Sequence, residues 1–400
     1  MAAKLERVSK TATGRPGTLL RRLRAMGAVA LLTVGSWAAA QGLRADHPET
    51  YVVQRGDTLW SIAAKFLDRP WLWPEIWQAN PQIGNPHELY PGDVISLAYG
   101  EEAAIRLSPG PRDTPPLTGI PLSEIEPFLK DLRVVQEFES LPYVVGLEED
   151  RLRVGQGQLA YLKGAPAGVG ERVTIVRPTQ RYTHLDRATA CCDLFRSEDL
   201  DFRGRRTLDG AGFWTDVLVP GGKELLGHEL MRVATGTITR GTPGGIEAST
   251  LLLDDDSREV RIGDRVLPVD PQPYDLQFFP HAPATTFDYG RARVLAVADM
   301  LSTGGTHDVV ALSVGARDGI DNGTVFSAWR MGSNAVDQVE YGADRSEDTV
   351  PSAGHVRLPD EYASHLLVFR TFERMSYALV MDSVKPTRVG YELKHPDAPY

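Results

Sequence analysis

The chain has 400 residues, of which 42% are hydrophobic and 24% charged, and its formal net charge is −10. This composition is that of a globular protein and excludes a disordered or fibrous chain. The length predicts two or three domains, at about 150 residues for each domain. Nucleic acid and anionic membrane surfaces are bound through Lys and Arg, so an acidic chain has no electrostatic reason to bind either. We expect no nucleic-acid partner.

The first 40 residues differ from the rest of the chain. Seven basic residues accompany a single acid, Glu6, and an apolar run from Ala25 to Trp37 is followed by three alanines. This pattern predicts a signal peptide over residues 1–40, cut after Ala40, and hence export to the periplasm or cell envelope. The run is shorter than the about 20 residues that cross a bilayer, so an uncleaved membrane anchor is the weaker alternative. Cleavage would leave 36 basic and 52 acidic residues, a net charge of −16.

The only two cysteines, Cys191 and Cys192, are adjacent in the sequence. A disulfide between neighbouring residues closes a strained ring and cannot join distant segments. We therefore favour buried or free thiols over a redox or intermolecular role.

Residues 51–97 have the pattern of one small unit with the order strand, helix, helix, strand. Tyr51–Val53 is a short apolar run, and a turn with a helix N-cap follows it. The next apolar residues recur at helical spacing. Pro74 suits the first position of a second helix, which the Asn80-Pro81 pair ends. A Pro-Gly-Asp turn then leads into a strand over Val94–Leu97.

This unit resembles a LysM domain, the small glycan-binding module of bacterial cell-wall proteins. The resemblance rests on Tyr-x-Val, Gly-Asp-Thr-Leu-x-x-Ile-Ala, Asn-Pro, Ile and Pro-Gly-Asp-x-Ile, which occur in that order over residues 50–98. It implies a βααβ fold and peptidoglycan glycan strands as the partner. The stretch between the two helices is longer and richer in Trp than is usual for the family.

The resemblance also implies a shallow groove for N-acetylglucosamine-containing glycan between two loops. One loop enters the first helix and the other leaves the second. The implied residues are Gly56, Asp57, Thr58 and Leu59 on one side, and Asn80, Pro81 and Ile83 on the other. Asp, Thr and Asn are equally what helix caps and helix ends require, so for each polar residue capping competes with glycan binding.

Three of the seven tryptophans lie within seven positions, at Trp71, Trp73 and Trp77. A small domain needs large side chains to build a core, so we expect Trp60 and Trp77 to be buried. Trp73 and Trp77 share one helical face. Trp71 precedes the helix, and we expect it to be the most exposed and the best candidate for stacking on a sugar.

Residues 99–140 are rich in proline and predict an extended spacer, with a short helix somewhere in Ser123–Val135. From residue 141 to 400 the chain is β-rich, with strand-length apolar runs bounded by Gly, Pro or Asp. Similar glycine turns recur in 141–270 and 288–397, which suggests either two similar halves or convergent turn chemistry. The predicted fold class is α+β: a small βααβ module followed by a mainly-β domain.

The β-rich region carries no recognisable catalytic or metal-binding motif. His228-Glu229 begins like a zinc-protease helix, but no second histidine follows at the required spacing. The run Asp254–Asp256 is more typical of a solvated hairpin tip than of a cation site, and Glu148–Asp150 is interpreted in the same way. We expect no catalytic residue, no metal and no cofactor.

The sequence therefore predicts a non-catalytic peptidoglycan-binding protein that tethers a β-rich domain to the cell wall. Two alternatives stay open. The β-rich domain could be a cell-wall hydrolase with an unrecognised site, or a scaffold that binds an envelope protein partner.

Overall fold

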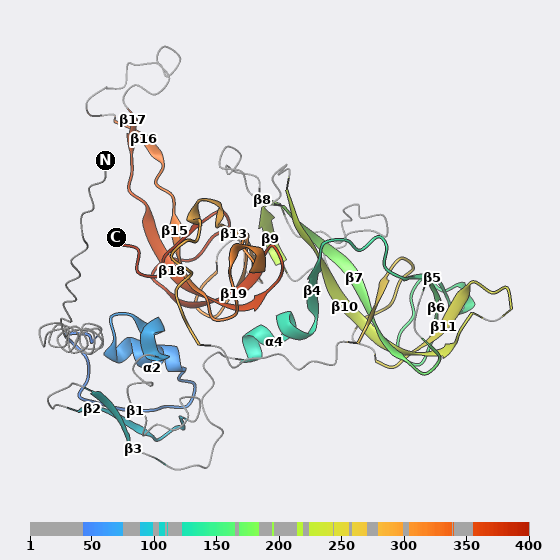
Figure 1. Ribbon diagram of the computed structural model, residues 1–400, viewed down its shortest axis with the longest axis horizontal. Helices are drawn as coiled ribbons and strands as arrows, with labels where there is room; N and C mark the ends of the chain where they lie inside the picture. Colours follow the sequence, from blue (N-terminus) through green and yellow to red (C-terminus); the bar gives the residue numbers. More distant parts are fainter. Residues whose placement is uncertain are drawn as a thin grey trace, which may run out of the picture. The chain divides into compact units, whose positions relative to one another are not determined.

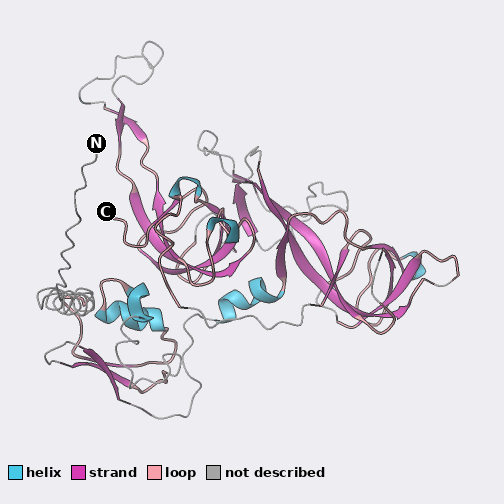
Figure 2. Ribbon diagram, in the orientation of Figure 1, coloured by secondary structure: helices cyan, strands magenta, loops and turns pink. Residues whose placement is uncertain are grey.

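The computed structural model describes residues 43–74, 89–98, 104–108, 110, 122–164, 168–183, 194–195, 214–218, 224–242, 244–255, 258–269, 279–298, 304–337, 339 and 355–399. The predicted signal peptide and the two cysteines lie outside these residues. No helix within them is long and apolar enough to cross a membrane. The chain divides into two compact units between residues 117 and 118, and Figures 1 and 2 show that strands dominate the second.

The first unit contains a three-stranded antiparallel sheet and a short helix. Its elements in chain order are β1 (Thr50–Val52), α2 (Leu59–Phe66), the 3-10 turn η1 (Pro70–Leu72), β2 (Val94–Ala98) and β3 (Ala104–Ser108). Strand β2 lies between β1 and β3. The apolar face of α2 is buried with Val53, Leu89 and Ile95 in one core. The first predicted helix is thus confirmed, while most of the second, after Pro74, lies outside the described residues.

The segment predicted as an extended spacer is largely structured where it is described. Strand β3 pairs along the whole of β2, and the fully buried carboxylate of Asp93 accepts the N–H groups of Tyr90 at 3.0 Å and Gly110 at 2.6 Å. Helix α4 (Leu122–Lys130) and strand β4 (Leu132–Val135) follow. The short helix predicted within Ser123–Val135 is present as α4, which tolerates Pro127 in its interior. The prolines misled the prediction of an extended spacer because those before α4 come after β3 and not within it.

Strands dominate the described part of the second unit, as predicted, and the structure shows that they pair antiparallel. Its remaining elements are β5 (Tyr143–Leu147), η2 (Glu148–Asp150), β6 (Leu159–Lys163), β7 (Arg172–Thr183), β8 (Leu194–Phe195), β9 (Trp214–Leu218), β10 (Leu225–Arg240), β11 (Ala248–Leu253), β12 (Arg265–Pro268), η3 (Tyr289–Arg291), β13 (Val294–Ala298), β14 (Val309–Leu312), η4 (Ala316–Asp318), β15 (Val325–Arg330), β16 (Asn334–Val336), β17 (His355–Arg357), β18 (Glu361–Thr371), β19 (Ser376–Ser383) and β20 (Glu392–Lys394).

The strands close into two rings of the same connectivity. In the first ring, β5 pairs with β6, β6 with β11, β11 with β10, β10 with β7, β7 with β12, and β12 with β5. In the second ring, β13, β14, β19, β18, β15 and β20 pair in the same order, and a bridge between Arg293 and Glu392 closes it. Each ring encloses its own apolar core. We call them the first and the second barrel.

The two barrels correspond bond by bond. Gly170 donates its N–H to the carbonyl of Ile238 at 2.8 Å, and Gly323 donates to Val368 at 2.8 Å at the equivalent place. Strand β12 corresponds to β20, and β10 to β18. Further equivalent residues are Val144 and Val294, Gly157 and His307, and Gly263 and Gly390. This shared hydrogen-bond pattern is what two similar halves of the chain would show. The boundaries of the halves, 141–270 and 288–397, and their common origin stay predictions.

A buried polar cluster joins the two barrels. Glu229 of β10 is completely buried and accepts hydroxyl hydrogen bonds from Thr179 at 2.8 Å, Tyr182 at 2.9 Å and Tyr377 at 2.7 Å. Tyr377 belongs to β19 of the second barrel. Burial raises the pKa of both tyrosines well above the usual value, so their hydroxyls stay protonated donors. Arg370 of β18 donates to main-chain carbonyls at the end of α4.

Candidate functional site

The loop that enters α2 is held by its own side chains. Gly56 has a φ of 92°, which glycine adopts without strain, and a Cβ there would meet no atom within 4 Å. The carboxylate of Asp57 accepts the Tyr51 hydroxyl at 2.8 Å and the Gln54 N–H at 2.8 Å. Burial and, after it, this contact with Asp57 raise the pKa of Tyr51 to about 12. Sequence reasoning missed the pair between Tyr51 and Asp57, which lie six residues apart and meet because the turn closed by the Asp57 N–H on the Gln54 carbonyl, at 3.2 Å, folds the chain back.

Thr58 is the N-cap of α2. Its hydroxyl accepts the N–H of Ser61 at 3.1 Å, while the Ser61 hydroxyl accepts the Thr58 N–H at 2.9 Å, so the two residues form a capping box. Thr58 is only 7% exposed. Its side chain therefore has a structural task, and glycan contact by Thr58 stays a prediction.

The resemblance also places Leu59 in the groove, and this expectation is wrong for its side chain. The side chain is fully buried among Ile62, Phe66 and Ile95. The reason is helical periodicity, which places Leu59 on the same face as the other core residues of α2.

The other side of the predicted groove cannot be placed. Asn80, Pro81 and Ile83 lie outside the described residues, so their part in binding stays a prediction. On the described side, the exposed residues of the loop are Gln54, Arg55 and Gly56. With Asp57 and Thr58 engaged in hydrogen bonds of the turn and the helix cap, this side can offer a glycan chiefly the main chain of the loop tip.

The tryptophans form core rather than an exposed platform where they are described. Trp60 is 2% exposed, as predicted, and Trp73 is 3% exposed. Trp71, expected to be the most exposed, is only 7% exposed. It lies in the turn η1, which contacts α2, so the chain folds it back onto the helix. Trp77 lies outside the described residues.

In the second unit, the residues singled out from the sequence have structural roles. His228 and Glu229 are on strand β10, not on a helix, and Glu229 is engaged in the buried cluster. No group of three metal-ligating side chains occurs among the residues that the structure describes. Glu148–Asp150 forms the turn η2, in which Glu149 and Asp150 are exposed as expected, whereas the half-buried Glu148 accepts the N–H of Leu159 at 3.1 Å.

The prediction of a solvated tip at Asp254–Asp256 is wrong for its first two residues. Asp254 accepts hydrogen bonds from Arg172 at 3.3 Å and from Thr237 at 3.0 Å. Asp255 accepts the N–H and the hydroxyl of Thr235, each at 2.9 Å. The third residue, Asp256, is not described. The sequence could not show this because the donors come from strands β7 and β10.

Comparison with known proteins identifies one segment of the first unit. A model of the LysM domain matches residues 51–98. The uncharacterized protein YqbP of Bacillus subtilis (strain 168) is 35% identical in an alignment of length 60, and the match covers 12% of this chain and 27% of that protein. The similarity thus spans well under a third of either chain. Residues 51–98 are a LysM domain, a peptidoglycan-binding module, in a chain whose second unit is built of antiparallel β-sheets.

Proposed function

We propose that this chain is exported to the cell envelope, attaches non-covalently to peptidoglycan through the LysM domain, and holds the two barrels close to the wall. The observation that carries the proposal is the LysM match over residues 51–98. The basic, then apolar, N-terminal segment supports export. In this proposal the second unit catalyses no reaction and the partner is the N-acetylglucosamine-containing glycan strand.

The binding should be weak for a single module. A shallow site leaves little interaction energy after the entropic cost of association. The described loop supports a contact through the exposed main chain at Arg55 and Gly56, whose N–H and C=O groups can pair with N-acetyl groups. The predicted residues Asn80, Pro81 and Ile83 would complete the groove from the other side.

Co-sedimentation with purified sacculi tests the proposal. Three proteins are compared: residues 41–400, residues 41–117 and residues 118–400. The first fragment must extend to residue 117 because β3 and Gly110 complete the sheet around Asp93. Residues 41–117 should retain most of the binding of the longer chain. If that fragment folds and none of it sediments, the LysM domain is not the attachment site.

The same incubation tests the hydrolase alternative. The supernatant is analysed for soluble muropeptides by chromatography, with boiled protein as the control. The proposal expects none above the control. Muropeptides released by residues 118–400 would instead make the second unit an enzyme.

A further inference from the structure

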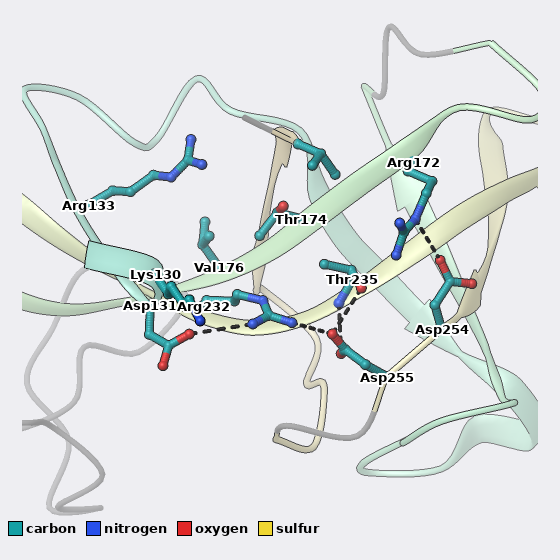
Figure 3. A pocket seen from close by; sticks show the side chains of 11 residues that line it. Lys130, Asp131, Arg133, Arg172, Thr174, Val176, Arg232, Thr235, Asp254 and Asp255 are labelled. Atoms are coloured by element: carbon teal, nitrogen blue, oxygen red, sulfur yellow. Dashed lines mark hydrogen bonds and ion pairs between the residues drawn. The ribbon is translucent and has the colours of Figure 1, made fainter. Parts of the chain in front are cut away.

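A pocket of about 370 Å3 lies on the outer face of the first barrel (Figure 3). Arg172, Thr174 and Val176 of β7 point into it, because they alternate with the core residues Val173 and Ile175. The end of α4, β4, β10 and the segments after β11 and β12 supply the rest of the wall. Small-ligand sites have volumes of about 300–1,000 Å3, so the pocket has room for a ligand.

The charges of the pocket favour an anion. Four basic side chains and three carboxylates line it, in a chain whose formal net charge is −10, and of the basic side chains Lys130 is already paired with Glu126. The carboxylates are engaged: Figure 3 shows Arg232 between Asp131 and Asp255. Arg172 donates to Asp254 only through Nε, at 3.3 Å, and its side chain is 61% exposed. Among the described residues its two Nη groups have no acceptor, so they can hold a carboxylate in the two-point geometry that guanidinium favours.

The second barrel contains the same polar arrangement. Asp255 accepts from the main chain and side chain of Thr235, as described above. Asp382 accepts the N–H of His365 at 3.2 Å and pairs with its Nδ1 at 3.0 Å. The strand pairing aligns the remaining positions in the same way. Equivalent residues are Asp255 and Asp382, Thr235 and His365, Arg232 and Tyr362, and Thr174 and Ser327.

In the second barrel this place is occupied by a peptide segment of the chain itself. Nε2 of His365 donates to the carbonyl of Pro396 at 3.2 Å, and the hydroxyl of Ser327 donates to the carbonyl of His395 at 2.6 Å. In the first barrel, the equivalent Thr235 and Thr174 line the pocket instead. One copy of the repeated site thus holds a peptide main chain, and the other copy is hollow.

We propose that the pocket of the first barrel binds a short peptide that carries a carboxylate. The main chain of the peptide lies along Thr174 and Thr235, as residues 395–396 lie along the equivalent residues of the second barrel. Its carboxylate pairs with the Nη groups of Arg172. The ligand class is the peptide stem of peptidoglycan, which has free carboxylates, and this assignment rests on the proposed function. The LysM domain would then bind the glycan while the first barrel binds the stem.

Isothermal titration of residues 41–400 with two soluble probes tests the inference. One probe is a peptidoglycan stem tetrapeptide, and the other is an N-acetylglucosamine oligomer without peptide. Arg172→Gln should weaken tetrapeptide binding at least tenfold and leave binding of the oligomer unchanged. The matched control is Arg153→Gln, which removes a similarly exposed arginine of the same barrel that pairs with Glu259 outside the pocket. The control should bind both probes as the unmodified chain does.

A tetrapeptide with amidated carboxylates separates carboxylate recognition from general peptide binding. It should bind at least tenfold more weakly than the free acid. The proposal is overturned if the unmodified chain does not bind the free tetrapeptide, if Arg172→Gln binds it normally, or if the amidated form binds equally well. Oligomer binding reports separately on the LysM domain: its loss with tetrapeptide binding intact would refute the glycan-binding function and leave the pocket assignment standing.

Discussion

The cap of helix α2 gives the sharpest prediction about the LysM domain. Thr58→Ala removes the acceptor of the Ser61 N–H, and N-cap replacements of this kind cost about 1 kcal/mol, with a range of roughly 0.5–2 kcal/mol. Domains have roughly 0.05–0.15 kcal/mol of stability per residue, so a module of this size has about 2–7 kcal/mol in total. The loss is therefore a substantial fraction of its stability. Thr58→Ser keeps the hydroxyl and should restore most of it.

Urea unfolding of residues 41–117 measures this effect, with the fluorescence of the buried Trp60, Trp71 and Trp73 as the signal. The midpoint should fall for Thr58→Ala and return for Thr58→Ser. Sacculus binding is measured on the same proteins in buffer, with the amount bound corrected for the folded fraction. A cap predicts equal corrected binding by all three. An unchanged midpoint together with weakened binding by Thr58→Ala would show that the hydroxyl contacts the glycan and that the capping argument is wrong.

Three further predictions concern the cores and the second barrel. Leu59→Ala should destabilise the LysM domain by about 2–5 kcal/mol in urea titrations, because it empties a fully buried site. Its binding should fall only in proportion to the fraction of the protein that is unfolded. Tyr377→Phe should lower the free energy of unfolding of the second unit by about 1.5–3 kcal/mol, since a hydrogen bond to the buried Glu229 carboxylate is lost; no change in its denaturation midpoint would contradict the cluster's role. Burial opposes protonation of His365, but the hydrogen bond and the negative charge of Asp382, together with the Pro396 carbonyl and the charge of Asp397, outweigh burial and raise the pKa of His365. The charged form of His365 therefore stabilises the fold fully below the ordinary histidine pKa of about 6.5, and this contribution is lost as pH rises through the raised pKa. The difference in free energy of unfolding between the unmodified chain and Asp382→Asn should therefore shrink above pH 6.5, as measured in a series of denaturation curves.

Much of the LysM domain could be predicted from local sequence because its signals are local. The turn at Gly56, the cap at Thr58 and the helical spacing from Leu59 to Phe66 lie within eleven consecutive residues, and the structure places each of them as expected. Several of the β-strands were likewise visible as apolar runs between turn residues. The sequence could not show which polar loop residues cap the helix and which bind glycan, because capping and binding require the same side chains.

The sequence by itself determined the glycan-binding module and the β-rich character of the second unit, since periodicity and turn residues act over a few positions. Only the tertiary structure decided how the strands close into two barrels, because strand pairing joins residues as distant as Tyr143 and Arg265. It also placed Trp71 in the core. The pocket of the first barrel depends in the same way on residues from Lys130 to Val269. Side chains so far apart in the chain meet only when the barrel closes, so no local pattern could indicate the pocket.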